Sequence, residues 1–369
     1  MDVMQRAIGL MSGTSMDGID IAAIETDGEG TVRRLAHTHV PYSNSVHILL
    51  RQAIADAKHL TDRMARPGSL AEAEAQLTHL HATCVKEFLA ANNWSLADFA
   101  ILGFHGQTVL HRPERGLTVQ LGDGQRLADE TGLTVAYDLR AADVAAGGQG
   151  APLAPAYHLA MAAKIPERPI AIVNIGGVAN VTWIGRGDTL LAFDTGPGNN
   201  AIDDWIRLHT GASYDENGAT AATGTIDKEK LDEICAHHYF AQLPPKSLDR
   251  NAFDFSCVDD LNLADGAATL TAVTAVSIGK SAFHFPEEPA LWIVSGGGRR
   301  NKTLMMILAG EVENAVVPAE AFGFNGDIIE AEAWAYLAVR TAKGLPLTFP
   351  DTTGVTQAMT GGRIAHPSA

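Results

Sequence analysis

Residues 12–18, Ser-Gly-Thr-Ser-Met-Asp-Gly, combine two glycines, three side chains that can donate or accept at phosphate, and short apolar runs on either side, residues 7–11 and 19–24. Glycine lets a backbone approach a phosphate without a Cβ in the way, while hydroxyls and backbone N–H groups donate hydrogen bonds to its oxygens. A plain hairpin turn is the simpler interpretation, because Asp17-Gly18 alone favours one. The segment is longer and richer in hydroxyls than a tight turn needs, so it predicts a phosphate-binding hairpin.

A second glycine-bearing turn, residues 194–200 (Asp-Thr-Gly-Pro-Gly-Asn-Asn), follows the apolar run 190–193 and begins with an acid. A carboxylate directly after a strand can take a proton from an attacking oxygen or orient a metal-bound phosphate. Asp194 is therefore the leading candidate for a catalytic residue. Its alternative role is to cap the helix expected at 201–209.

The same turn also fits the permissive form of the dinucleotide fingerprint, Gly-x-Gly-x-x-Ala from Gly196 to Ala201, with Asp215 and Glu216 near the spacing of the ribose-binding acid. Pro197 stiffens the turn, and the preceding strand is not the first of a parallel unit. The pattern therefore favours a phosphate loop without a dinucleotide.

A third turn, Ser295-Gly296-Gly297-Gly298, follows the apolar run 291–294. Consecutive glycines leave flat backbone against which a base or ribose can lie, and a helix starting near Arg300 would direct its positive end at an anion. A strand-to-helix turn without a ligand is the alternative.

Polar groups suited to a sugar lie between these turns. His105-Gly106-Gln107-Thr108 follows an expected strand and offers uncharged groups that can hydrogen-bond sugar hydroxyls. Arg140, Asp143 and the glycine-rich residues 147–150 follow within fifty residues. A lone histidine would more often be structural. The polar residues that accompany His105 favour a role in one half of a sugar-binding pocket.

The elements that must position these groups alternate between strands and helices, which predicts an α/β fold with ligands at the carboxyl ends of the strands. The opening pattern of apolar run, glycine turn and apolar run recurs from Ile170, as a duplicated fold would leave it. Strands are expected at 7–11, 19–24, 31–41, 99–104, 190–193, 291–295 and 315–317. Helices are expected at 45–57, 69–91, 201–209, 227–239, 259–285 and 327–342.

Composition limits the partners and the compartment. The 369 residues carry 27 Lys and Arg against 43 Asp and Glu, a formal net charge of −16, which disfavours nucleic acid and anionic membranes. Three cysteines without a paired spacing argue against a disulfide framework or a zinc site, and no apolar run approaches membrane-spanning length. We therefore expect a cytoplasmic protein whose phosphate site is built from backbone N–H groups, a metal ion or a few cations.

The three glycine turns in this order resemble the two phosphate loops and the adenosine loop of the superfamily that contains hexokinase, actin and the heat-shock ATPases. Within it, the chain resembles the anhydro-N-acetylmuramic acid kinase family along nearly its whole length. The motifs that carry the resemblance are GLMSGTSMDGID, GFHGQT, AAGGQGAPLAPAYH, NIGGVANVT, FDTGPGN, PPKS and GRIAHP. The resemblance implies a duplicated actin-like (RNase H-like) ATPase fold with a central cleft, a first lobe of 1–168 joined by 345–369, and a second lobe of 169–344.

The resemblance also implies roles for matched residues. Asp194 would be the general base. Lys246 within PPKS and Arg250 after it are candidates for a further role in the site. The expected ATP-binding residues are Gly13, Thr14, Ser15, Met16, Asp17, Gly18, Ile19, Asp20, Gly196, Gly198, Gly296, Gly297 and Gly298. The expected sugar-binding residues are His105, Gly106, Gln107, Thr108, Arg140, Asp143, Gly148 and Glu330. No motif binds metal directly, and Mg²⁺ is expected to arrive with ATP near Asp17, Asp20 and Asp194.

The implied activity is ATP-dependent phosphorylation of 1,6-anhydro-N-acetylmuramic acid with hydrolysis of its anhydro ring, giving N-acetylmuramic acid 6-phosphate in peptidoglycan recycling. The expected partners are the sugar and ATP, with a second copy of the chain in a homodimer. Two alternatives stay open: a kinase of another sugar acid without ring opening, and a non-enzymatic actin-like ATP-binding module.

Overall fold

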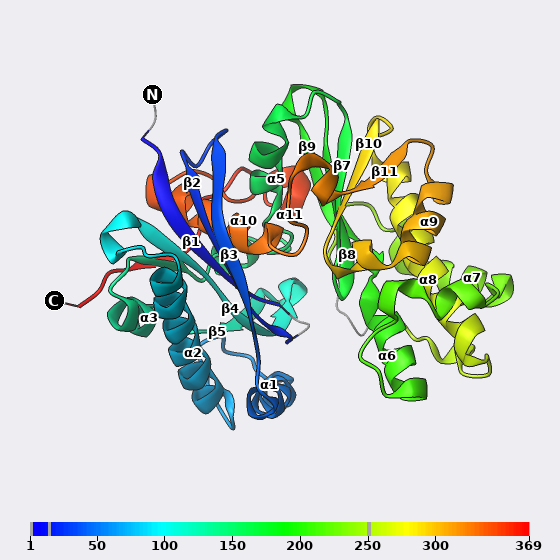
Figure 1. The fold of residues 1–369 in the computed structure, drawn as a ribbon, viewed down its shortest axis with the longest axis horizontal. Coiled ribbons are helices and arrows are strands. Elements are labelled where there is room, and N and C mark those ends of the chain that lie inside the picture. Colours follow the sequence, from blue (N-terminus) through cyan, green and yellow to red (C-terminus); the bar gives the residue numbers. More distant parts are fainter. Residues whose placement is uncertain (1–2, 14–15, 249–251, 369) are drawn as a thin grey trace. The chain divides into compact units, whose positions relative to one another are not determined.

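The computed structural model describes residues 3–13, 16–248 and 252–368. The chain divides into two compact units, and each is described by itself. Unit 1 comprises Met1–Ile165 and Ile328–Ala369, and unit 2 comprises Pro166–Asp327 (Figure 1).

Unit 1 is built on a seven-stranded sheet with the order β12-β6-β4-β1-β2-β3, in which β5 also pairs with β4. The first three strands form an antiparallel meander, whereas β4 is parallel to β1 and β6 is parallel to β4. The strands are β1 (Gln5–Ser12), β2 (Gly18–Thr26), β3 (Val32–Pro41), β4 (Ile101–Arg112), β5 (Leu117–Leu121), β6 (Val135–Tyr137) and β12 (Arg363–Ala365).

Unit 2 repeats this topology in a five-stranded sheet with the order β11-β10-β7-β8-β9. Its first three strands are again an antiparallel meander, and β10 and β11 continue in parallel from β7. The strands are β7 (Ile170–Ile175), β8 (Val178–Ile184), β9 (Leu190–Pro197), β10 (Leu291–Ser295) and β11 (Ala315–Pro318). The second sheet begins at Ile170, where the sequence repeat was predicted, and it has the same strand arrangement as the first. The predicted duplicated actin-like fold is therefore confirmed.

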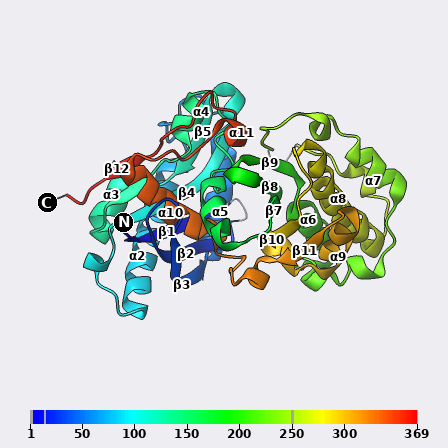
Figure 2. The same ribbon diagram turned by 90° about the horizontal axis from the view of Figure 1, so that it is seen from above.

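Helices cover the sheets within each unit (Figure 2). Those of unit 1 are α1 (Asn44–Ala57), α2 (Leu70–Ala91), α3 (Gly124–Thr131), α4 (Ala141–Ala145), α5 (Pro155–Met161), α10 (Ile329–Lys343) and α11 (Pro350–Thr353). Those of unit 2 are α6 (Asn199–Thr210), α7 (Lys228–Cys235), α8 (Leu263–Lys280) and α9 (Lys302–Glu311). Within the described residues, no helix has both the length and the apolar character to cross a membrane.

The placement of α10 corrects the predicted boundary between the lobes. Residues 328–344 were assigned to the second lobe, but α10 packs on β1, β2 and β4 and belongs to unit 1. The approach is close because two paired strand positions are glycines. A Cβ on Gly9 would lie 1.9 Å from Ala331 O, and one on Gly103 would lie 2.1 Å from Trp334 O.

Two of the predicted turns begin later than expected, and so does one predicted helix. β4 continues to Arg112, so residues 105–108 lie within a strand instead of after it. Asp194 likewise lies inside β9, which continues to Pro197. After β10 the glycines form a short 3-10 turn, and α9 begins only at Lys302. Polar and glycine residues remain strand-like here because neighbouring strands supply their backbone hydrogen bonds.

Candidate active site

In unit 1, an irregularity in β4 holds the start of the predicted phosphate hairpin. Ser12 Oγ donates to Gly106 O at 2.8 Å, and Gln107 Nε2 donates to Gly13 O at 3.0 Å. Gly106 has a φ of 70°, and a Cβ there would lie 2.5 Å from Leu121 O, so this position requires glycine. The segments predicted to bind phosphate and sugar therefore meet where the carboxyl end of β1 lies against the middle of β4.

The described residues of the turn between β1 and β2 make backbone contacts. Met16 has a φ of 57°, and Asp17 O accepts the N–H of Tyr42 at 3.0 Å. Thr14 and Ser15, both predicted ATP contacts, lie outside the described residues, as does Arg250. The described part of the turn is thus anchored to the segment that follows β3.

The second half of the hairpin packs against its own unit. A Cβ on Gly18 would lie 2.3 Å from Val40 O, so this glycine allows the close approach of β3. Ile19 is fully buried in the core. Asp20 Oδ1 lies 2.8 Å from His39 Nδ1 on β3. The Asp20 carboxylate therefore lies beside the hairpin and already contacts a histidine.

His105 is buried and neutral. Arg140 NH2 lies 3.1 Å from His105 Nε2, and because an arginine can only donate, Nε2 must accept. The ring proton therefore sits on Nδ1, which lies 2.5 Å from Gly106 O and 3.1 Å from Ser12 O. Burial, reinforced by the positive charge of Arg140, lowers the pKa of His105 to about 3. This histidine orients Arg140 and does not exchange protons near neutral pH.

Arg140 is held from three directions. Besides its contact with His105, NH1 donates to Gly150 O at 2.8 Å, and the guanidinium lies 5.4 Å from the ring centroid of Trp334. The Trp334 ring in turn lies 4.8 Å from the His105 ring. Trp334 was not predicted as a site residue, although a lone tryptophan in an alanine-rich helix is a signal of close packing.

Asp143 organises the glycine-rich turn that follows it. Its Oδ1 accepts the N–H of Gly150 at 2.6 Å, and its Oδ2 accepts the hydroxyl of Thr353 at 2.6 Å. A Cβ on Gly148 would lie 2.3 Å from Asp143 Oδ1. Both residues were predicted to contact the sugar. In the structure, the Asp143 carboxylate contacts Gly150 and Thr353, and Gly148 packs closely against Asp143.

The remaining predicted sugar residues lie on β4 and α10. Thr108 Oγ1 accepts from Gln120 Nε2 at 3.2 Å, and Glu330 is half-buried in the first turn of α10. Glu332, two residues further along α10, is buried and accepts from Arg34 Nε at 2.9 Å.

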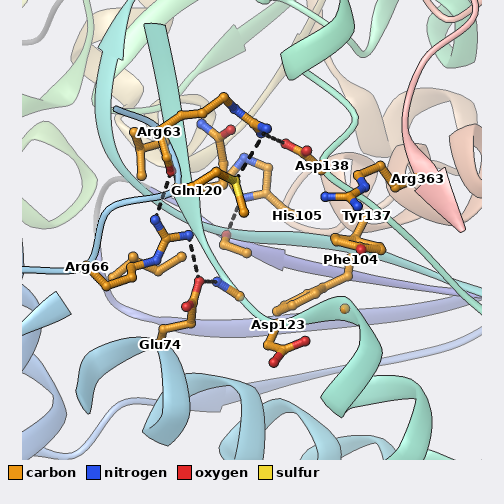
Figure 3. A pocket seen from close by; sticks show the side chains of 16 residues that line it. Arg63, Arg66, Glu74, Phe104, His105, Gln120, Asp123, Tyr137, Asp138 and Arg363 are labelled. Atoms are coloured by element: carbon orange, nitrogen blue, oxygen red, sulfur yellow. Dashed lines mark hydrogen bonds and ion pairs between the residues drawn. The ribbon is translucent and has the colours of Figure 1, made fainter. Parts of the chain in front are cut away.

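A cavity of about 240 Å³ opens beside this part of unit 1, and Figure 3 shows its walls. His105 and Gly106 line it, together with charged side chains from other elements. Arg63 pairs with Asp138, and Arg66 NH2 lies 2.8 Å from Glu74 Oε1. The charges in the walls largely compensate one another.

In unit 2, Asp194 lies on β9, an edge strand, where the segment 246–248 covers the outer side. Asp194 N donates to Lys246 O at 3.0 Å, and Leu248 N donates to the carboxylate oxygen Oδ2 at 2.8 Å. Tyr239 Oη donates to Asp194 O at 2.6 Å. The acid has 8% of its surface exposed, and the backbone N–H of Leu248 fixes one of its carboxylate oxygens.

The turn after Asp194 is joined to the hairpin between β7 and β8. Gly198 N donates to Gly177 O at 3.1 Å, and Asn199 N donates to Gly176 O at 2.8 Å. A Cβ on Gly198 would lie 2.3 Å from Gly176 O, and one on Gly196 would lie 2.8 Å from the Ser277 side chain. These glycines allow two turns to share one small space.

The triple glycine that follows β10 lies against the carboxyl end of β7, next to the β7–β8 hairpin. Gly296 has a φ of 75°, and a Cβ there would lie 2.4 Å from Asn174 Oδ1, whereas one on Gly298 would lie 2.3 Å from Ile175 Cγ2. Gly297 has more room, since its Cβ would meet nothing nearer than Asn199 Nδ2 at 3.6 Å. Three glycine turns therefore gather at the carboxyl ends of β7 and β10 and the N-terminus of α6.

Sequence reasoning missed the contribution of the β7–β8 hairpin to this cluster. Gly176 and Gly177 were noted only as part of the repeat and of a family motif, although the corresponding hairpin of unit 1 was predicted to bind phosphate. The repeat was the available signal, because equivalent turns of a duplicated fold occupy equivalent positions. Among the residues that the structure describes, no three His, Cys, Asp or Glu side chains form a group that could hold a metal ion.

The sequence profile of the anhydro-N-acetylmuramic acid kinase family matches residues 5–367. The chain belongs to this family. Family members named anhydro-N-acetylmuramic acid kinase include one from Methylorubrum populi, 50% identical over 99% of this chain and all of the relative. Another, from Brucella canis, is 49% identical over 99% of each chain.

Comparison with solved structures gives more distant likenesses. The activator of the 2-hydroxyisocaproyl-CoA dehydratase from Clostridium difficile, with bound ADPNP, aligns at a TM-score of 0.48 and 12% identity, covering 92% of this chain and 96% of that one. At these values the likeness does not bear on what this member of the kinase family binds.

Buried histidines should make this family member sensitive to acid. Burial lowers the pKa of His81 and of His158 to about 4, and that of His105 to about 3, from the ordinary 6.5. The unfolded chain therefore gains protons below pH 6.5 that the folded chain does not bind, so stability falls as the pH falls from 6.5 towards 4. Each group contributes up to about 1.4 kcal/mol per pH unit.

Thermal unfolding measured at intervals from pH 7.5 to pH 5 checks this expectation. A His81→Gln variant should show a shallower fall of Tm below pH 6.5 than the unmodified protein. His59→Gln, at an exposed histidine of the same unit, is the matched control and should leave the slope unchanged. Equal slopes for all three proteins would contradict the assignment of a neutral His81.

Proposed function

We propose that this chain uses ATP to phosphorylate 1,6-anhydro-N-acetylmuramic acid and hydrolyses the anhydro ring in the same turnover. The products are N-acetylmuramic acid 6-phosphate and ADP, and the setting is peptidoglycan recycling in the cytoplasm. Full-length membership of the kinase family is the observation that carries the proposal. The glycine turns of both units and the backbone-held Asp194 support it.

The proposed reaction assigns Asp194 as the general base. A water molecule gives its proton to the Asp194 carboxylate and forms a bond to the anomeric carbon, while the bond from that carbon to O6 breaks. O6 then bonds to the γ-phosphorus, and the bond from that phosphorus to the bridging oxygen of ADP breaks. Only one carboxylate is needed, because O6 leaves onto phosphorus and requires no separate acid.

The groups of unit 1 suit recognition of the sugar more than proton transfer. Arg140 supplies a fixed positive charge, whose orientation His105 maintains. Gln107 and Thr108 supply uncharged polar groups that match hydroxyl and amide substituents. We propose that Asp143 and Gly148 contribute to sugar binding indirectly, by shaping the turn at 147–150.

The glycine turns suit the phosphates and the nucleoside. Backbone N–H groups at the hairpin of unit 1 can donate to phosphate oxygens, and Gly297 has room beside it for an adenosine. Mg²⁺ would supply further positive charge at the phosphates. Its preference for one or two carboxylates with phosphate and water ligands fits Asp17 and Asp20 beside the hairpin.

An assay of ADP release tests the proposal directly. The purified protein with ATP and the anhydro sugar should release ADP, and in ¹⁸O-labelled water the product should carry one ¹⁸O at the anomeric carbon. ADP release with glucose or glycerol but not with the anhydro sugar would favour the alternative of another sugar kinase. Nucleotide binding without turnover on any sugar would favour a non-enzymatic module.

A further inference from the structure

Lys246 has an unusual environment in unit 2. Its side chain is buried, with 6% of the residue exposed, and its ammonium lies 4.6 Å from the ring centroid of Tyr239 and 5.6 Å from that of Phe193. Nζ donates to Tyr239 O at 3.1 Å and lies 3.5 Å from His284 Nε2. Over residues 3–13, 16–248 and 252–368, it has no ion pair with a carboxylate. A buried lysine without such a pair is rare.

The contacts of Lys246 close a ring around the backbone of Asp194. Tyr239 donates its hydroxyl to Asp194 O, Asp194 donates its N–H to Lys246 O, and Lys246 donates its ammonium to Tyr239 O. Two residues later, Leu248 N donates to Asp194 Oδ2. Each bond depends on the others, because the segments at 239 and 246–248 are not part of the sheet.

The ammonium is the one member of this ring that joins the two loop segments through a side chain. Without it, Tyr239 O would keep the N–H of Gln242 but lose its charged donor, and the two aromatic rings would lose the cation between them. The segment 246–248 would then be held to β9 by fewer contacts. Leu248 N, the donor that fixes one carboxylate oxygen of Asp194, would be free to shift.

The surroundings of Nζ also argue against a direct role in binding phosphate. Phe193, Tyr239 and His284 enclose it, and burial lowers the pKa of Lys246 to about 8. A lysine that binds phosphate keeps its ammonium open to the ligand. The function of this one is therefore exerted through its neighbours.

We propose that Lys246 is a positioning residue that holds the carboxylate of Asp194 in the orientation required for catalysis. The inference rests on the proposed function, in which Asp194 is the base. It assigns the lysine of the PPKS motif a role in the chemical step without contact to either substrate. A misplaced base slows the chemical step while substrate binding is retained, so kcat and KM should respond differently.

Steady-state kinetics of Lys246→Met test this role. Methionine approximates the length and volume of the lysine stem and removes the ammonium. We expect kcat to fall by about 10 to 100-fold, because small displacements of a catalytic group have effects of this size. The KM values for ATP and for the anhydro sugar should stay within about threefold.

Lys280→Met is the matched control. Lys280 also donates to a backbone carbonyl, Cys235 O at 3.3 Å, and also lies over an aromatic ring, Phe240 at 5.7 Å, but it has no contact with the ring of bonds around Asp194. Its kcat should remain within about twofold of the unmodified protein. Equal losses in both variants would mean that the loss of any lysine at a carbonyl and an aromatic ring in unit 2 lowers turnover, and would overturn the inference.

Tyr239→Phe keeps the aromatic ring and removes the hydroxyl that donates to Asp194 O. It should lower kcat in the same way, and the double variant with Lys246→Met should be little worse than the more impaired single variant, because both act through one network. This variant carries the test if Lys246→Met does not fold. An unchanged kcat in Tyr239→Phe, or a raised KM with unchanged kcat in Lys246→Met, would overturn the inference.

The outcomes separate this inference from the proposed function. An unmodified protein that does not turn over the anhydro sugar overturns the proposed function, and the positioning role with it. An active unmodified protein together with a fully active Lys246→Met overturns the positioning role alone.

Discussion

An Asp194→Asn variant is expected to lose about a thousandfold in turnover while it still binds ATP. The amide cannot accept the proton of the attacking water, and general bases typically contribute factors of 10² to 10⁴. The fold should be preserved, since the Asn oxygen can still accept from Leu248 N as Asp194 Oδ2 does. The measurements are kcat from ADP release and the dissociation constant of ATP from calorimetry.

Asp204→Asn provides the control for this change. Asp204 is exposed on α6 and lies 2.6 Å from Arg207 NH1, so the same chemical substitution is made ten residues further along in an ion pair at the surface. Its turnover should remain within about twofold, since exposed ion pairs contribute little. If Asp194→Asn retains more than a tenth of the activity, the base must be sought elsewhere.

The second large effect is expected from Gly9→Val. A Cβ at this position would lie 1.9 Å from Ala331 O and 2.5 Å from Ala335 N, both in the backbone of α10. Backbone atoms cannot rotate away as a side chain can, so the helix must move off the sheet. We expect the free energy of unfolding to fall by about 4 kcal/mol or more, in the range of severe overpacking.

Loss of activity should accompany this destabilisation. Trp334 on α10 lies against both Arg140 and His105, so displacement of the helix would also disturb the groups proposed to bind the sugar. Thermal and urea unfolding, together with the ADP-release assay, measure the two effects. Soluble protein with an unchanged Tm would show that α10 is not docked on β1 as described.

Gly30→Val is the matched control in the same unit. A Cβ at Gly30 would meet nothing within 4 Å, and the residue is exposed between β2 and β3. The substitution has the same chemistry and no clash. Its Tm should change by no more than about two degrees, as surface substitutions usually do.

Much of the architecture could be predicted because its signals are local. The apolar run at β10 and the apolar stripe of α2 depend on residues close together in the sequence, and both elements were predicted within one residue of their observed bounds. The repeat at Ile170 likewise records the order of elements along the chain. The motifs then identified the family, since they occur together and in order from end to end.

Individual contacts of the candidate site could not be predicted in the same way. Asp143 was grouped with the sugar-binding residues by the family resemblance and by its place near them in the sequence. Neither signal shows that its carboxylate holds Gly150 and, from more than two hundred residues away, Thr353. A side chain that can donate or accept has many potential partners, and only the folded chain decides which one is near.

The sequence alone determined the duplicated α/β topology, the family and the segments that carry the glycine turns, because these depend on residue type, periodicity and order. The tertiary structure decided that α10 belongs to unit 1, that His105 is neutral and orients Arg140, and that Lys246 is enclosed beside Asp194. An apolar helix face shows that the helix packs, but not on which sheet. That choice depended on Gly9 and Gly103, which lie far apart in the sequence and form a space for the helix backbone only when β1 and β4 pair in register.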